Sequence, residues 1–241
     1  MTAFLVSVTT VDEALTAVEC GAGIIDCKDP ARGALGALPV ATVAAIRAAV
    51  SRGTPVSATI GDFPVETAAI VDAAFEMAQS GCDLIKIGFF PGGDACETIR
   101  ALGGLRQTLR CGIVGLLLAD HDPDLALIET MAEAGFSGVM LDTAGKGGCL
   151  TDHMSPSALS SFISSARQRS LFSGLAGSLR ISDIATLMRL KPNVLGFRGA
   201  VCAKGIRTNP LAGDAVLAVR TEMDRVADFD AEPVVPSTAA L

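Results

Sequence analysis

The chain has 241 residues, half of them hydrophobic, and a formal net charge of −7. A chain of this length and composition can form a large hydrophobic core. It can fold as one large domain or as two small ones. The sequence contains no Trp, no Tyr and no basic cluster. It therefore lacks both the aromatic platforms that bind single-stranded nucleic acid and the charge that binds a phosphate backbone. We expect no nucleic-acid partner.

Hydropathy and the cysteine pattern bear on membrane attachment, secretion and metal binding. No run reaches the roughly 20 apolar residues of a membrane span, and residues 1–4 lack the charged start of a signal peptide. The seven cysteines form no CxxC motif, and His121 and His153 match no zinc spacing. We expect a reduced, cytoplasmic protein with no membrane attachment, no metal and no cofactor. Homo-oligomers remain possible.

Short apolar runs recur along the chain and alternate with Ala-rich helical stretches. The runs expected as strands cover residues 4–8, 23–27, 55–60, 84–88, 112–118, 138–142, 171–174 and 194–197. The helices that follow them are expected to begin near residues 10, 39, 64, 95, 123, 156, 181 and 210. Strict alternation predicts a parallel sheet, and eight units predict an α/β fold closed into a single (β/α)8 TIM barrel.

The domain boundaries follow from composition. No linker-like shift interrupts the alternation, so we expect one barrel domain over residues 1–227. The segment 228–241 turns to Asp, Pro, Ser and Ala, which predicts a flexible C-terminal tail.

Ionisable residues lie where the expected strands end. Asp26 and Lys28 are two residues apart at the end of the second strand, so they project from one face. Taken alone, such a pair is more often a salt bridge that closes a strand. Lys86 lies in the fourth strand between Ile85 and Ile87, which a period of two places on the opposite face. We therefore expect Lys28 and Lys86 to face the barrel interior.

Lysine is rare and unevenly placed. The five lysines are Lys28, Lys86, Lys146, Lys191 and Lys204. Only Lys191 is expected at the opposite end of the barrel, and arginines such as Arg47 are expected to supply surface charge on the outer helices. Unlike a guanidinium, a desolvated amine can lose its proton and act as a nucleophile or base. Buried lysines without such a role would need partners, for which Asp26 and Asp142 are candidates.

Two glycine-rich regions are candidates for substrate binding. Asp142 opens the segment 142–148, in which Lys146 either faces a substrate or is solvated. The segments 173–178 and 196–200 follow strands seven and eight, where barrels often bind phosphate. The residues expected to bind phosphate there are Gly174, Gly177, Ser178, Arg198 and Gly199. Tight packing of small residues at a barrel rim is the alternative.

These features together predict Schiff-base chemistry on a phosphorylated aldehyde or ketone, with a second amine or a carboxylate moving protons. Several segments, in order, resemble one known family, the (5-formylfuran-3-yl)methyl phosphate synthases, also called 4-(hydroxymethyl)-2-furancarboxaldehyde-phosphate synthases. They are LVSV at 5–8, DCKDP at 26–30 with Gly33 and Leu35-Gly36, DLIKIG at 83–88, DTA at 142–144, GLAGSL at 174–179 and GFRGAVC at 196–202. The resemblance extends to about residue 226.

The resemblance implies a lyase that condenses two molecules of glyceraldehyde 3-phosphate into 4-(hydroxymethyl)-2-furancarboxaldehyde phosphate. One phosphate and two waters would be released, and the product would enter biosynthesis of a methanofuran-type one-carbon coenzyme. The resemblance places the Schiff-base lysine at Lys28 and the proton-accepting lysine at Lys86. Supporting residues fall on Asp26, Asp142 and Lys146, and Asp26 is expected to orient or deprotonate Lys28.

Two alternatives remain open because a fold does not determine a reaction. One is another class I aldolase or isomerase acting on triose phosphates, which would form no aromatic ring. The other is a non-catalytic barrel that binds sugar phosphates, in which borohydride would trap no adduct.

Overall fold

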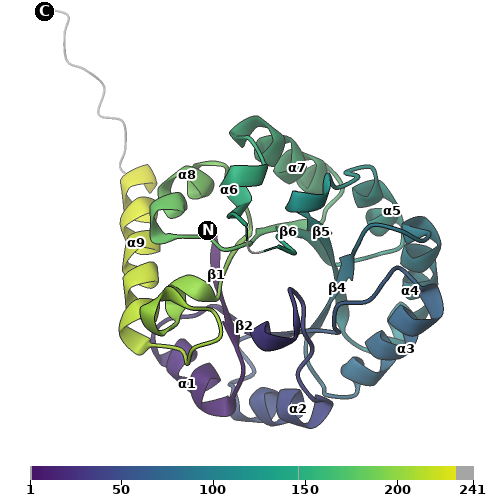
Figure 1. Cartoon of the computed structure of the whole chain (residues 1–241), viewed down its shortest axis with the longest axis horizontal. Helices are drawn as coiled ribbons and strands as arrows, with labels where there is room; N and C mark the ends of the chain where they lie inside the picture. The colour runs from purple at the N-terminus through teal and green to yellow at the C-terminus, as the bar shows by residue number, and fades with distance from the viewer. Residues whose placement is uncertain (1, 146, 232–241) are drawn as a thin grey trace, which may run out of the picture.

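The structure is a computed structural model that describes residues 2–145 and 147–231. Eight parallel strands close into a barrel in the order β1 to β8, and helices surround it (Figure 1). The strands are β1 Ala3–Val8, β2 Ile24–Cys27, β3 Val56–Thr59, β4 Leu84–Phe89, β5 Gly112–Leu118, β6 Gly138–Asp142, β7 Phe172–Leu175 and β8 Val194–Phe197. The predicted TIM barrel is confirmed.

The outer layer consists of α-helices, and short 3-10 turns connect it to the strands. The helices are α1 Val11–Glu19, α2 Val40–Ala49, α3 Thr67–Ala78, α4 Ala95–Leu109, α5 Leu127–Glu133, α6 Leu150–His153, α7 Pro156–Gln168, α8 Ile184–Arg189 and α9 Gly213–Ala231. The 3-10 turns are η1 Pro30–Arg32, η2 Ala119–His121, η3 Ile181–Asp183, η4 Gly199–Val201 and η5 Ala203–Gly205. Helix α6 lies between β6 and α7, ahead of the helix that was expected to begin near residue 156.

Local sequence explains where individual helices begin. The Thr10 hydroxyl accepts the Glu13 amide at 3.1 Å, and this bond satisfies one of the free amides at the start of α1. Ser155 caps α7 in the same way, and Pro156 occupies the first turn. Helix α9 continues to Ala231, beyond the boundary expected at 227. Residues 232–241, on which most of the expected tail falls, lie outside the described part of the chain.

The pleat of the strands separates two apolar layers. Ile85 and Ile87 point outward into the large core between barrel and helices, as their spacing around Lys86 predicted. A second, smaller cluster fills the barrel interior. Its buried members are Leu5, Ala34, Leu35, Val114, Leu116, Met140, Ala176 and Val194. Leu35 comes from the loop after β2, so this loop enters the barrel and forms part of the wall around the site.

Arg47 does not provide surface charge, and that expectation was wrong. Its side chain is 5% exposed and donates from Nη1 to Asp83 at 2.6 Å. The other terminal nitrogen donates to the carbonyls of Val50 and Ser51 at 2.8 and 2.7 Å. A planar guanidinium fits this site because it can serve a carboxylate and several carbonyls at once. Arg47 therefore ties the end of α2 to the start of β4.

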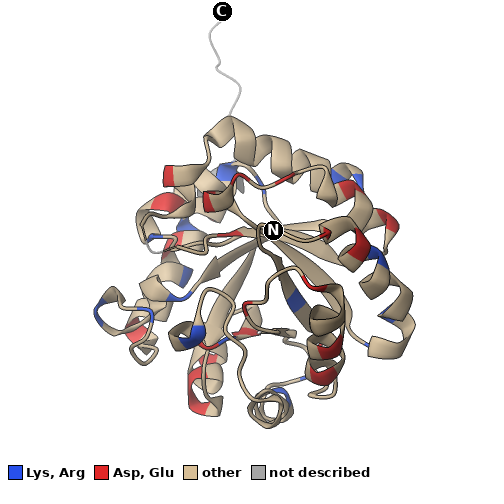
Figure 2. Cartoon of the chain, turned by 45° about the vertical axis from the view of Figure 1, so that its right-hand side comes forward, with Lys and Arg blue, Asp and Glu red and all other residues tan. Residues whose placement is uncertain are grey.

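Acidic and basic residues are interspersed over the outer helices and loops (Figure 2). Within the described residues, none of the helices combines the length and apolar composition that crossing a bilayer requires.

Candidate active site

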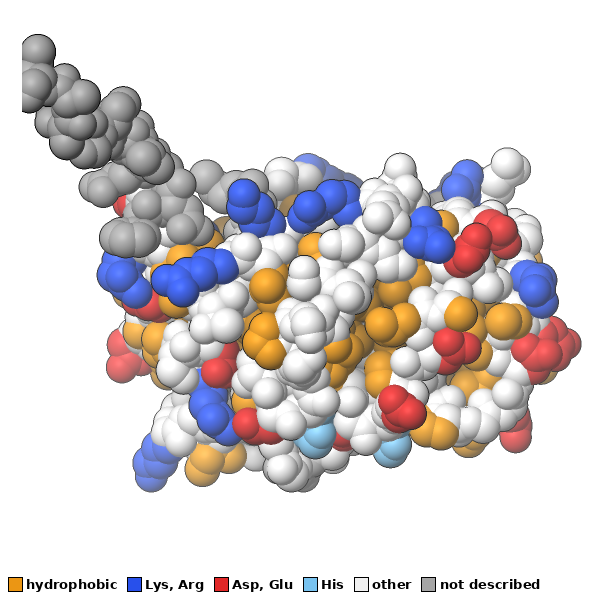
Figure 3. All heavy atoms as spheres, turned by 90° about the horizontal axis from the view of Figure 1, so that it is seen from above, with side chains coloured by type: hydrophobic (Ala, Val, Ile, Leu, Met, Phe, Trp, Pro, Cys, Tyr) orange, Lys and Arg blue, Asp and Glu red, His pale blue; other side chains and the backbone are white. Residues whose placement is uncertain are grey.

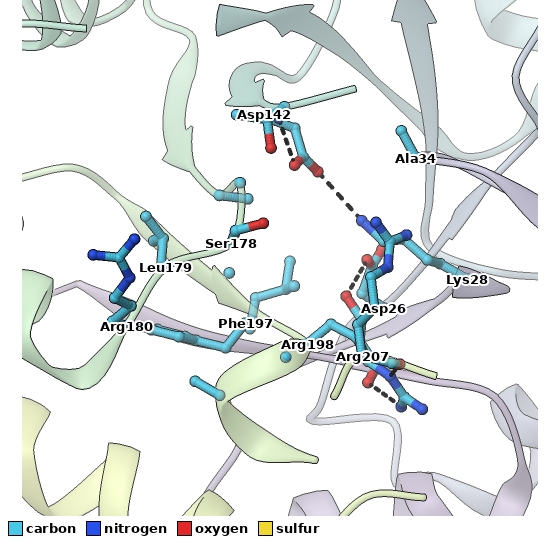
Figure 4. A pocket seen from close by; sticks show the side chains of 18 of the residues that line it. Asp26, Lys28, Ala34, Asp142, Ser178, Leu179, Arg180, Phe197, Arg198 and Arg207 are labelled. Atoms are coloured by element: carbon cyan, nitrogen blue, oxygen red, sulfur yellow. Dashed lines mark hydrogen bonds and ion pairs between the residues drawn. The ribbon is translucent and has the colours of Figure 1, made fainter. Parts of the chain in front are cut away.

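A cavity of about 670 Å³ lies at the carboxyl end of the barrel strands (Figure 4). Its lining includes eight of the residues expected from sequence: Asp26, Lys28, Lys86, Asp142, Gly177, Ser178, Arg198 and Gly199. Lys146 lies outside the described residues. The structure thus brings together both candidate lysines, both candidate carboxylates and most of the expected phosphate loops.

The buried centre of the site is an ion pair between Lys86 and Asp26. The Lys86 amine lies 2.8 Å from Oδ1 of Asp26, and the two side chains are 3% and 0% exposed. Ser7 and Ser57, which are in register with Asp26 on β1 and β3, donate to its carboxylate at 2.9 and 2.7 Å. Three donors therefore satisfy a carboxylate that has no access to water.

Electrostatics keep this carboxylate ionised. Burial alone would raise the pKa of Asp26, because it disfavours the charged form. The ammonium groups of Lys86 and Lys28 outweigh burial, and the pKa of Asp26 lies below its usual 3.8. Asp26 is consequently a fixed negative charge at neutral pH that stabilises a cation beside it.

Lys28 has a different partner. Its amine lies 3.3 Å from Oδ2 of Asp142, across the barrel mouth (Figure 4). The other Asp142 oxygen accepts the Thr143 amide at 2.8 Å. Both carboxylates were expected as candidate partners of the buried lysines, and Asp26 was expected to support Lys28. Asp26 pairs with Lys86, and Asp142 pairs with Lys28, because Lys28 stands two residues nearer the mouth than Asp26 and extends above it.

The loop after β7 supplies hydrogen-bond donors to the cavity. Gly177 has φ +102°, and a side chain there would press against Thr143. Ser178 also has a positive φ of 50°, so the chain turns sharply here. Within the described residues, the amides of Ser178, Leu179, Gly199 and Ala200 donate to no protein acceptor. Clustered free amides at a barrel mouth suit an oxyanion.

Arg198 is engaged within the protein. Nε donates to the carbonyl of Arg207 at 2.9 Å, and Nη1 donates to Ser7 O and Glu13 Oε2 at 3.0 and 2.6 Å. Nη2 donates to Glu13 Oε1 and Asn209 O at 3.3 and 3.0 Å. All five N–H groups are used. Arg198 thus fixes the loop after β8 to the end of β1, and in this arrangement it has no donor left for the phosphate it was expected to bind.

The Glu13–Arg198 pair should make stability depend on pH. Burial alone would raise the pKa of Glu13. Hydrogen bonds from Arg198 and from the Leu211 amide have the larger effect, so the pKa of Glu13 lies below its usual 4.5. A depressed carboxylate stabilises the fold above its unfolded pKa and loses that contribution as pH falls through the folded value. We expect Glu13→Gln to lower Tm at pH 7, with the difference from wild type shrinking as pH falls below about 4.5. Thermal melts across pH measure this; a difference independent of pH would contradict it.

Gly174 does not line the cavity. It is the register partner of Met140 inside the barrel, and a Cβ at this position would collide with the Met140 side chain. We expect Gly174→Ala to destabilise the protein by about 1–3 kcal/mol through overpacking, without weakening phosphate binding. Urea unfolding measures the change. Gly104→Ala is the matched control: nothing lies near an added Cβ in α4, so it should be neutral or stabilising.

Three residues near the site were not foreseen. Arg180 and Arg207 line the cavity. Asp120 follows β5 and accepts the amides of Ala144 and Gly145 at 2.9 and 2.6 Å, which fixes the start of the loop after β6. Asp120 could have been found, because it is a carboxylate two residues after the expected strand 112–118, at the same end of the barrel as Asp26 and Asp142. The two arginines lie in loops that carry no such signal.

Neither histidine lies in the cavity. His121 and His153 are both exposed on the surface (Figure 3). Over residues 2–145 and 147–231, no group of three or more His, Cys, Asp or Glu is arranged to hold a metal ion.

Comparison with solved structures agrees with the fold. A 3-hexulose-6-phosphate synthase from Salmonella typhimurium matches with a TM-score of 0.62 and 16% identity, covering 92% of this chain and 100% of that one. A phosphoribosyl anthranilate isomerase from Thermus thermophilus matches with a TM-score of 0.64 and 14% identity, covering 94% of this chain and 100% of that one. At these identities the likeness concerns the fold alone.

Sequence comparison is more specific. A relative from Methylorubrum extorquens, provisionally named (5-formylfuran-3-yl)methyl phosphate synthase, is 43% identical over 88% of this chain and 87% of its own. An enzyme named (5-formylfuran-3-yl)methyl phosphate synthase from Archaeoglobus fulgidus is 35% identical over 88% of this chain and 95% of its own. An enzyme of the same name from Methanococcus maripaludis strain C6 is 34% identical over 84% of this chain and 91% of its own. The family model described as 4-HFC-P synthase matches residues 4–220. With this match along almost the whole barrel, the chain belongs to the 4-HFC-P synthase family.

Proposed function

We propose that the chain condenses two molecules of glyceraldehyde 3-phosphate into 4-(hydroxymethyl)-2-furancarboxaldehyde phosphate through a Schiff base on Lys28. The product would enter biosynthesis of a methanofuran-type coenzyme. One observation carries the proposal: a single cavity holds two lysine amines, each beside its own carboxylate, at 3.3 Å for Lys28 and 2.8 Å for Lys86. A Schiff-base enzyme needs one amine to bond carbon and a second group to move protons.

Lys28 is the better placed nucleophile. Its ion pair is the longer of the two, and it lies nearer the mouth than the Lys86–Asp26 pair. Asp142 can accept the proton that Lys28 must lose before its amine attacks the aldehyde carbon. Loss of water from the resulting carbinolamine gives an iminium, which draws electrons from the neighbouring carbon.

Lys86 then takes up a proton from that carbon, and phosphate leaves from the next one. To act as a base, Lys86 must be neutral, so it first gives its proton to the carbinolamine hydroxyl that leaves as water, while Asp26 stays ionised. The carbon nucleophile adds to the second triose phosphate, and cyclisation with loss of water forms the aromatic ring. Overall, two trioses yield one furan phosphate, one inorganic phosphate and two waters, which makes the enzyme a carbon–oxygen lyase.

The surroundings support this chemistry. The free amides after β7 and β8 can bind a phosphate group, and the interior cluster below the site restricts water. All seven cysteines are free, which supports the cytoplasmic location expected from sequence.

A product assay tests the proposal directly. The purified chain is incubated with glyceraldehyde 3-phosphate as the sole substrate, and the products are followed by proton NMR and by phosphate release. We expect furan ring and aldehyde resonances, with one inorganic phosphate released per furan. An aldolase or isomerase would form a new sugar phosphate or dihydroxyacetone phosphate without an aromatic ring, and either result would overturn the proposal.

A further inference from the structure

One positive charge at the cavity has no counter-charge among the residues that the structure describes. The cationic side chains that line it are Lys28, Lys86, Arg180, Arg198 and Arg207. Asp142, Asp26 and Glu13 pair with Lys28, Lys86 and Arg198, and Asp152 lies 3.5 Å from Arg180. Within the described residues, Arg207 forms no salt bridge. In a chain with a net charge of −7, an unpaired guanidinium beside a cavity is a candidate anion ligand.

Arg207 is held in place by hydrogen bonds, but some of its N–H groups have no acceptor among the described residues. Its backbone carbonyl accepts Nε of Arg198 at 2.9 Å, and its own Nη2 donates to the Gly33 carbonyl at 2.7 Å. The Nε of Arg207 is buried, and it has no hydrogen-bond partner among the described residues. A buried N–H without an acceptor costs free energy, and among the described residues Nη1 of Arg207 also donates to no acceptor, so the protein alone leaves this guanidinium unsatisfied.

The contact with Gly33 is itself anchored. Both carboxylate oxygens of Asp62 accept amides from the same loop, Ala34 at 2.8 Å and Leu35 at 2.6 Å. Leu35 is fully buried in the barrel interior. The carbonyl that orients Arg207 therefore belongs to a fixed wall of the cavity, and the remaining donors of the guanidinium are preorganised.

Arg207 belongs to the loop after β8 and lies across the cavity from the loop after β7. In Figure 4, Ser178, Leu179 and Arg180 lie on one side of the cavity, whereas Lys28, Asp26 and Arg207 lie on the other. A reaction that joins two phosphorylated trioses must accommodate two phosphate groups in one cavity. The amides of Ser178 and Leu179 after β7 can hold one of them, and Arg198 has no free donor for the other.

We propose that Arg207 forms a second phosphate-binding subsite, opposite the loop after β7, that receives one of the two triose phosphates. This inference rests on the proposed function for its substrate, but the site itself is a binding site for a phosphate monoester and can be tested without turnover.

The probe is sn-glycerol 3-phosphate, which has no aldehyde and cannot form an imine. Isothermal titration calorimetry at high protein concentration counts the molecules bound per chain. We expect two for wild type and one for Arg207→Gln, whose amide can still donate to the Gly33 carbonyl. Affinity for the lost site should fall about 10- to 100-fold, the effect of one charge-assisted hydrogen bond. Arg100→Gln, at an exposed position on α4 outside the cavity lining, is the matched control and should bind two.

Two results would overturn the inference: one probe molecule per wild-type chain, or two per Arg207→Gln chain with unchanged affinities. Melting curves of both variants show whether they are folded, and Arg207→Lys, which keeps the charge, should recover part of the binding. If two sites are present but no furan forms from glyceraldehyde 3-phosphate, the proposed function fails while the subsite stands.

Discussion

Lys28→Arg is expected to reduce furan formation by at least ~10⁴-fold, the scale on which removal of a covalent nucleophile acts. The guanidinium keeps the positive charge beside Asp142, which lies 3.3 Å from the lysine amine. It cannot lose its proton at accessible pH, so it cannot form an imine. Initial rates of furan appearance with glyceraldehyde 3-phosphate measure the effect, and Tm should change little.

The matched control for this substitution is Lys191→Arg. Lys191 is exposed and follows α8, at the end of the barrel away from the cavity. The same lysine-to-arginine change there should leave the rate within about twofold of wild type, as expected for a surface substitution. Furan synthesis by Lys28→Arg at a rate near that of the control would show that Lys28 forms no covalent intermediate.

Asp26→Asn is expected to destabilise the protein by about 3–5 kcal/mol, the cost of breaking a buried ion pair by removing one partner. Lys86 would be left 2% exposed, without its counter-charge. Ser7 and Ser57 would also lose the carboxylate to which they donate at 2.9 and 2.7 Å. The apparent free energy of unfolding in urea measures the loss.

A double substitution isolates the ion pair. Asp26→Asn combined with Lys86→Met removes both charges and replaces the amine by an apolar side chain of similar length. We expect the double variant to be more stable than Asp26→Asn alone, because no unpaired charge remains buried. Lys86→Met alone completes the cycle, and a double variant whose loss equals the sum of the two single losses would mean that the two residues are not energetically coupled.

The strand pattern of the barrel could be read from the sequence because each strand is short, apolar and followed by a helix-starting signal. Strand β6, for example, begins and ends at the expected residues, Gly138 and Asp142. The inward direction of Lys86 was also predictable, since Ile85 and Ile87 must share the opposite face. These are local properties, and a period of two suffices to find them.

The pairing of charges could not be read in the same way, because it depends on where strands distant in sequence place their side chains. Asp26 and Lys28 share a face, yet the ion pair of Asp26 forms with Lys86 from β4. Arg198 looked available for phosphate because Glu13, its partner, lies on a helix far away in the sequence. Arg207 carried no signal at all, since its role depends on the carbonyl of Gly33 in another loop.

Borohydride reduction in the presence of glyceraldehyde 3-phosphate, followed by peptide mapping, tests the central claim most directly. We expect one stable adduct, on the peptide that contains Lys28, and none in Lys28→Arg. An adduct mapped to Lys86 or Lys146, or active enzyme that yields no adduct under reduction, would contradict the assignment of Lys28 as the Schiff-base residue.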